Sequence, residues 1–247
     1  MASDDQPRRR AQSKFFSRCA LLMLAMVLLA FPFTYFGPVV SGSLQFLPVY
    51  HIHGLLFFGW IGLFAWQTHL VAGGRTARHR ELGLAGIAIS ALMVPLGVIL
   101  AIEAIKRRTA EGDPHPFDNT LYNVIDITCF AVLMIASSSA VTRQIEWHRR
   151  FTFGAAIVLV GPAISRWIFN PWFITIPQLS PLSDMAPNLT ADLFLIALAG
   201  HDRRTLGRVH PATLWLLLVL VPIHVVTPFL TASDWWRGLA PFITKLG

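Results

Sequence analysis

The chain has 247 residues, of which 54% are hydrophobic and only 13% are charged. A soluble domain carries about 25% charged residues, so this composition excludes an ordinary soluble fold and indicates that the solvent is lipid. The formal net charge of +7 does not indicate nucleic-acid binding, because the basic residues form short clusters between apolar runs rather than one continuous face. In a membrane protein, such clusters set the orientation in the bilayer.

Seven apolar segments follow one another along the chain, and most are about as long as a membrane span. They cover residues 17–40, 46–72, 82–105, 119–142, 151–171, 187–200 and 210–231. We therefore predict an all-α fold, a polytopic bundle of about seven transmembrane helices. The sixth segment, between Pro187 and His201, is the shortest. A bundle of six spans with one re-entrant segment is the alternative.

The basic residues of the short connections predict the orientation. Every second connection is basic, as is the N-terminal segment; the residues are Arg8–Arg18, Arg75, Arg78, Arg80, Arg143, Arg149, Arg150, Arg203, Arg204 and Arg208. We expect the N-terminus in the cytoplasm and the C-terminus outside a bacterial inner membrane. The expected parts are a basic cytoplasmic tail (1–16), one transmembrane helical domain (17–231) and a short extracytoplasmic tail (232–247). We expect the Pro-rich connection over residues 172–188 to lie over the outer mouth of the bundle.

Three ionisable residues interrupt the apolar segments: Asp126, Arg166 and Asp192. A charge near the centre of a bilayer costs about 2.5–3.5 kcal/mol on insertion scales, so each such group needs a partner or a function. All three fall in the outer half of their segments, and we expect them to form a buried polar cluster. The cluster is either an ion pair that holds helices together or a polar chamber that holds a ligand, a proton path or the charged edge of a cofactor.

Four histidines are placed as the axial ligands of two b-type haems would be. His53 and His224 lie on the outer side of their segments, and His79 and His148 lie on the inner side. We name these four as candidate cofactor-binding residues, with the charge of Arg166 neutralising a haem propionate. His79 and His148 also precede arginines, so the alternative is that they face lipid phosphates.

Two further patterns support close helix packing around a ligand. His53, Trp60 and Gln67 follow one another at intervals of seven and form one stripe along the second segment. The third segment begins near His79 and presents small residues that include Gly83 and Gly86, which allow a close helix or a flat cofactor.

No other metal site is indicated. The cysteines, Cys19 and Cys129, lie inside apolar runs, so neither a disulfide nor a cysteine-based metal site is expected. Zinc at His51, His53 and His224 is less favoured, because two histidines at a helix start do not fix a third ligand. No nucleotide-binding loop or nucleophile motif indicates a catalytic residue.

Several motifs resemble those of a widespread bacterial family of uncharacterised integral membrane proteins. They are H-G-x-L-F-x-x-W, G-G-R and H-R-x-L-G between His53 and Gly83, W-H-R-R-F at Trp147–Phe151, G-P-A-I-S-R at Gly161–Arg166, and A-D-L-F with G-R-V-H-P-A-T-L-W at Ala191–Trp215. This resemblance implies the fold but no activity.

A shorter stretch is similar to the ascorbate-type transmembrane cytochromes b. In that family, one span begins with a histidine and carries a glutamine further along. The next span also begins with a histidine and contains a glycine. The segments His53–Gln67 and His79–Gly83 have this pattern. The resemblance implies haem b at these positions.

The leading functional expectation is an inner-membrane electron-transfer protein that binds haem b and works with a redox partner or a larger membrane complex. Three alternatives stay open. The chain is a carrier or binding protein for a small apolar or anionic compound, an enzyme that acts on a lipid at the outer leaflet, or an assembly factor for a membrane complex.

Overall fold

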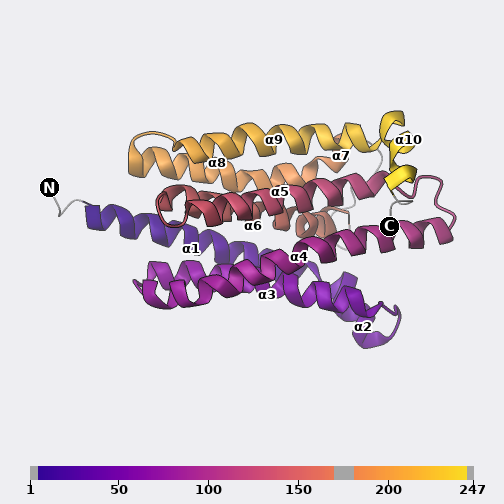
Figure 1. Cartoon of the computed structure of the whole chain (residues 1–247), viewed down its shortest axis with the longest axis horizontal. Coiled ribbons are helices and arrows are strands. Elements are labelled where there is room, and N and C mark those ends of the chain that lie inside the picture. Colours follow the sequence, from indigo (N-terminus) through magenta and orange to yellow (C-terminus); the bar gives the residue numbers. More distant parts are fainter. Residues whose placement is uncertain (1–4, 170–180, 244–247) are drawn as a thin grey trace.

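A computed structural model describes residues 5–169 and 181–243, and every regular element within these ranges is helical. The elements are α1 (Asp5–Ala30), a π-helical turn η1 (Pro32–Phe36), α2 (Gly37–Ser41), α3 (Pro48–Ala72), α4 (Thr76–Ala110), α5 (Asp118–Ala140), α6 (Ile145–Ile168), α7 (Pro181–Asp184), α8 (Ala186–Leu206), α9 (Pro211–Thr231) and α10 (Asp234–Ile243) (Figure 1).

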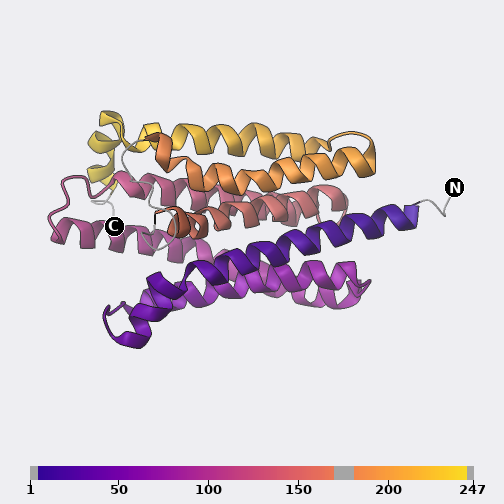
Figure 2. The same ribbon diagram turned by 180° about the vertical axis from the view of Figure 1, so that it is seen from behind.

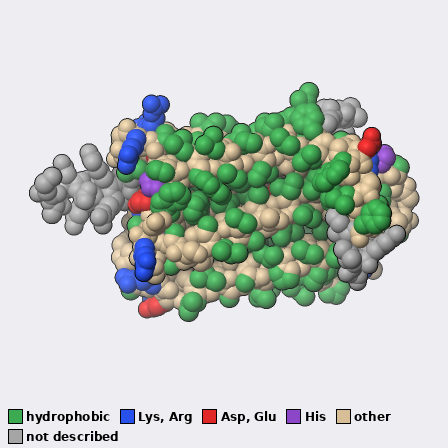
Figure 3. Space-filling view, turned by 45° about the horizontal axis from the view of Figure 1, so that its top comes forward, with side chains coloured by type: hydrophobic (Ala, Val, Ile, Leu, Met, Phe, Trp, Pro, Cys, Tyr) green, Lys and Arg blue, Asp and Glu red, His purple; other side chains and the backbone are tan. Residues whose placement is uncertain are grey.

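Within these ranges, seven helical segments are long and apolar enough to cross a membrane, and they lie in α1, α3, α4, α5, α6, α7–α8 and α9. The predicted all-α fold with seven spans is thereby confirmed. Hydrophobic side chains cover the middle of the face in Figure 3, and lysines and arginines gather mainly at one end of it, on the left of the view. A bundle in lipid needs this distribution, because its outer surface must be as apolar as its core.

The helices lie roughly antiparallel, with α6 near the centre of the bundle. Figures 1 and 2 both show α8 and α9 on one side and α1, α3 and α4 on the other, with α5 and α6 between them. Helix α6 packs against α1, α5, α8 and α9. Its central position explains why α6 buries residues on all its faces, among them Phe153, Ile157 and Ile164.

The two ends of the bundle differ in charge. We call the end that holds the α3–α4, α5–α6 and α8–α9 connections the basic end, because it carries Arg75, Arg143 and Arg203. The other end, which holds the α4–α5 connection and α10, is called the opposite end. The basic end is the one that the sequence predicts to be cytoplasmic.

The first and sixth spans differ from their predicted bounds. The first ends at Ala30 rather than at residue 40, because the chain passes into the π-helical turn at Pro32 and proline interrupts the hydrogen-bond ladder of a helix. The sixth continues through Asp202 to Leu206 and is closed by Gly207, whose φ of 74° favours glycine. The sixth segment is therefore long enough to span, and seven spans replace the alternative of six.

Both predicted tails contain helix. Residues 5–16 continue α1 without a break. In the C-terminal tail, α10 packs back onto the start of α5: Trp236 Nε1 donates to the carbonyl of Phe117 at 3.0 Å, and Arg237 Nη2 bonds Asp118 Oδ2 at 2.8 Å.

Most of the Pro-rich connection over 172–188 lies outside the described residues, so its expected place over the mouth stays a prediction.

Candidate functional site: a cavity at the opposite end and a histidine pair at the basic end

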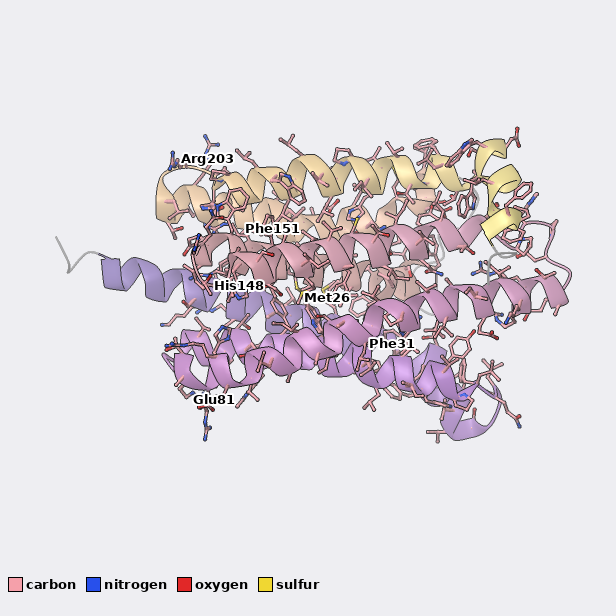
Figure 4. The ribbon with its side chains drawn as sticks, viewed as in Figure 1. Met26, Phe31, Glu81, His148, Phe151 and Arg203 are labelled. Carbon is pink, nitrogen blue, oxygen red and sulfur yellow. The ribbon has the colours of Figure 1, made fainter. Side chains whose placement is uncertain are left out.

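A cavity of about 460 Å³ lies in the half of the bundle nearer the opposite end, between α3, α4, α5, α6 and α8. Much of its wall is aromatic and includes Phe31, Phe57, Phe58 and Phe130. Figure 4 labels Phe31 in this half and His148 nearer the basic end. A volume of this size, with apolar walls and a few polar groups, is typical of a site for a small molecule.

Arg166 contributes a positive charge to this cavity from the last turn of α6. Its Nη1 atom donates to the carbonyl oxygen of Pro162 at 2.6 Å, and its guanidinium carbon lies 4.3 Å from the centre of the Phe31 ring. Among the described residues, no carboxylate forms an ion pair with Arg166. A guanidinium has five N–H donors in a fixed fork, and among the described residues the carbonyl of Pro162 is the one hydrogen-bond acceptor shown for them.

His53 reaches the same cavity from the second turn of α3. Its Nδ1 atom is buried and has no hydrogen-bond partner among the described residues, and its ring stacks on Phe57 with centroids 6.1 Å apart. Buried polar atoms are almost always hydrogen-bonded in folded proteins. An unsatisfied ring nitrogen beside a cavity therefore suits a ligand that supplies the missing partner.

The predicted stripe on α3 faces inward along its whole length. His53 lines the cavity, Trp60 is buried in the core, and Gln67 lines a second, smaller cavity nearer the basic end. The interval of seven residues thus identified the face of α3 that contacts the other helices.

The structure brings only part of the predicted polar cluster together. Asp126 lines the cavity with Arg166, whereas Asp192 is not among the lining residues. Asp192 is paired instead with His224, through Oδ2 and Nδ1 at 2.9 Å between α8 and α9, and both side chains are almost fully buried. Asp126 lies near enough to His224 for an electrostatic interaction. The expected ion pair between Arg166 and an aspartate is absent from the described part of the chain, in which Asp192 pairs with His224 instead.

His79 and His148 lie together at the basic end, as the sequence predicts. Their ring centres are 6.5 Å apart, and both rings line a cavity of about 100 Å³ between α1, α3, α4 and α6. His79 Nδ1 bonds Gln67 Oε1 at 2.8 Å, and His148 Nδ1 lies 2.8 Å from the hydroxyl and 3.1 Å from the carbonyl oxygen of Ser137. Gln67 Oε1 accepts and does not donate, so Nδ1 of His79 carries the proton and its Nε2 has a lone pair. The Ser137 carbonyl favours the same tautomer of His148, whereas the Ser137 hydroxyl can either donate or accept.

The described residues do not fit haem b at either predicted pair. At the basic end, a cavity of about 100 Å³ beside His79 and His148 is much smaller than a porphyrin. At the opposite end, His53 lines the larger cavity but His224 is not among its lining residues. Arg166 has the charge that a propionate needs, but no pair of histidines meets beside it among the described residues.

A third polar group was missed by reasoning from the sequence. Arg150, which the sequence places at the membrane surface, is completely buried, and its guanidinium donates to Asp202, to Thr213 and to Glu146. The same Asp202 accepts from Thr213 Oγ1 at 2.6 Å and from the backbone N–H of His210 at 3.2 Å. This network joins α6, α8 and α9.

One sequence signal pointed to this network. The sixth segment is a full span only if it continues into the Asp202–Arg204 turn or starts in the Pro-rich stretch before it. In the first case Asp202 lies inside a span, and a carboxylate there needs a partner. The network satisfies the charges of Arg150 and Asp202 within the protein, so we assign it a structural role.

The chain matches no known family model, no curated protein and no solved structure at a significant level. Its fold and its site therefore carry the functional argument alone. Seven apolar helices around internal polar groups are the architecture of a multi-pass membrane protein.

Proposed function

We propose that the protein is a membrane carrier or binding protein for a small organic anion with an apolar body, and that the ligand occupies the cavity beside Arg166. One observation carries this proposal: a guanidinium without a carboxylate partner among the described residues lies in a cavity with aromatic walls. A charge at this depth is costly unless it is paired. An anionic ligand would supply that pairing.

The surroundings of Arg166 indicate the kind of ligand. A carboxylate, phosphate or sulfate group matches the donor fork of arginine, and His53 Nδ1 offers a further polar contact in the same cavity. The phenylalanine rings favour an apolar or aromatic body, because burying such a body removes its surface from water. A volume of about 460 Å³ suits a molecule the size of an aromatic acid.

The basic residues at the basic end favour a position of that end in the cytoplasm of a bacterial cell. The cavity beside Arg166 then faces the extracytoplasmic half of the inner membrane. Reporter fusions after residue 142 and after residue 115 test this orientation. A cytoplasmic reporter is expected to be active only at the first position, and activity of a periplasmic reporter there would reverse the assignment.

Binding of radiolabelled benzoate to the purified protein in lipid nanodiscs tests the proposal. We expect saturable binding that unlabelled benzoate displaces and that benzamide, which has the same shape without the charge, does not. Arg166→Gln is expected to weaken binding about tenfold or more, since a hydrogen bond to a charged group is worth about 1.5–3 kcal/mol.

Arg107→Gln is the matched control, because Arg107 lies at the same end of the bundle but is exposed and paired with Glu111 on the surface of α4. It removes the same charge outside the cavity, and its binding is expected to equal that of the wild type. Equal binding by Arg166→Gln and the wild type would contradict the proposal, as would the absence of saturable binding by benzoate, octanoate and phenyl phosphate.

A further inference from the structure

We propose that His79 and His148 form a binding site for a single Cu(I) ion, held between α4 and α6 at the basic end of the bundle. This site is separate from the cavity that contains Arg166 and does not depend on the function proposed for that cavity. It rests on the distance between the two rings, on the anchoring of both Nδ1 atoms and on the number of ligands.

The distance between the two rings suits a shared metal ion. Their centres are 6.5 Å apart and their planes cross at 64°. A metal ion bound to one nitrogen of each ring, with bonds of about 2 Å, would hold the ring centres roughly 6 Å apart. The observed separation of the ring centres is therefore close to the separation that a shared ion requires.

Both imidazoles are prepared as ligands by the groups behind them. Gln67 Oε1 accepts from Nδ1 of His79, and Nδ1 of His148 lies within hydrogen-bond distance of both the hydroxyl and the carbonyl of Ser137. A histidine that binds a metal through one nitrogen commonly donates its other N–H to such an oxygen, which fixes the tautomer and the direction of the ring. The two Nε2 lone pairs are then left for an ion.

The number of ligands favours Cu(I). Among the described residues, no group of three or more His, Cys, Asp and Glu side chains is placed to hold a metal. Zinc sites almost always have three or four protein ligands. Imidazole binds copper well, and Cu(I) accepts two ligands in a linear arrangement.

The positive charges near the two histidines oppose a divalent ion more strongly than a monovalent one. Arg80 interacts electrostatically with His79, and Arg149 interacts with His148. A divalent ion would be repelled by these arginines about twice as strongly as Cu(I). The adjoining cavity of about 100 Å³, partly lined by Phe16, Phe64 and Val71, leaves room for an ion but for no large ligand.

Competition with bicinchoninate under anaerobic, reducing conditions tests the site in the purified protein. Because Cys19 and Cys129 also bind Cu(I) when accessible, all measurements use a Cys19→Ser, Cys129→Ser background. We expect one Cu(I) per chain, and X-ray absorption is expected to show two nitrogen neighbours. His79→Ala and His148→Ala are each expected to weaken binding at least tenfold, and Gln67→Leu about 10–100-fold, the range measured for such supporting residues.

His69→Ala is the matched control, because His69 lies at the same end of the bundle on α3, is exposed and stacks on Trp66. It is expected to bind one Cu(I) as tightly as the background protein does. His148→Gln is the second variant if His148→Ala does not fold. The proposal is overturned if the background protein binds no Cu(I), or if His79→Ala and a folded His148 variant bind as tightly as it does.

Discussion

Arg150 and Asp202 form an ion pair in which neither side chain is exposed at all. The two residues are 52 positions apart in the chain and join the first turns of α6 to the last turns of α8. Thr213 and the N–H of His210 add the start of α9 to the same carboxylate. This network fixes the relative positions of three helices at the basic end.

Breaking this pair is expected to destabilise the bundle strongly. Asp202→Ala leaves the guanidinium of Arg150 buried with one carboxylate fewer, and removing one partner of a buried pair costs about 3–5 kcal/mol. The measurement is thermal unfolding of the protein in detergent. The exposed pair Glu103–Lys106 supplies the control, since Glu103→Ala is expected to cost at most about 1 kcal/mol. Equal melting temperatures for Asp202→Ala and Glu103→Ala would contradict the structural role assigned to the Arg150–Asp202 pair.

Gly161 allows α6 and α8 to approach beside the cavity. A Cβ atom at this position would lie 2.0 Å from Oδ1 of Asn188, and Asn188 is part of the cavity wall. Gly161→Ala is therefore expected to push the Asn188 side chain aside, to cost about 1–3 kcal/mol of stability and to weaken benzoate binding. The double variant Gly161→Ala, Asn188→Ala is expected to regain stability. If the loss of stability of the double variant equals the sum of the losses of the two single variants, the clash with Asn188 is not the cause of the destabilisation.

His210 makes the stability depend on pH at the start of α9. Its ring nitrogen Nδ1 accepts from the backbone N–H of Ala212 at 3.1 Å, which requires the neutral form. Burial, and next the charge of Arg150, lower the pKa of His210 below its usual value. The histidine therefore takes up a proton at a higher pH in the unfolded chain than in the folded chain. The stabilisation by the neutral His210 cap is fully present above the unfolded pKa of about 6.5, and it decreases as the pH falls below that value.

The test compares the melting temperature of the wild type with that of His210→Asn between pH 7.5 and pH 5. Asparagine keeps an acceptor at the N-cap but does not titrate. The wild type is expected to lose more stability than the variant over this interval, and parallel curves would exclude His210 as the source. The comparison with the variant cancels the contributions of the other histidines.

The absorption spectrum decides between the haem hypothesis and the smaller ligands favoured by the cavities. Protein purified from cells supplied with haem is expected to show no Soret band, because the cavity beside His79 and His148 is smaller than a porphyrin and, among the described residues, His224 does not line the cavity beside His53. A Soret band that His79→Ala or His53→Ala removes would reinstate haem b and electron transfer. The same spectrum of a Lys106→Ala variant, changed only at the surface, controls for haem that is bound nonspecifically.

The sequence alone determined which parts of the chain span the membrane. Transfer into lipid depends on the summed polarity of about 20 consecutive residues, so it is a local property that needs no knowledge of neighbours. The sequence also determined which residues share one face of α3, because the positions of His53, Trp60 and Gln67 around the helix follow from helical geometry. The pairing of His79 with His148 also came from the sequence, since both residues lie at the same depth.

Only the tertiary structure decided which polar groups meet. Asp192 and Arg166 lie at similar depths, yet Asp192 pairs with His224 and Arg166 does not pair with an aspartate among the described residues. Arg150 looked like a surface residue and proved to be buried. Depth follows from position in the chain, whereas the partner of a side chain depends on the rotation of each helix and on which helices are neighbours, and packing between distant segments sets both.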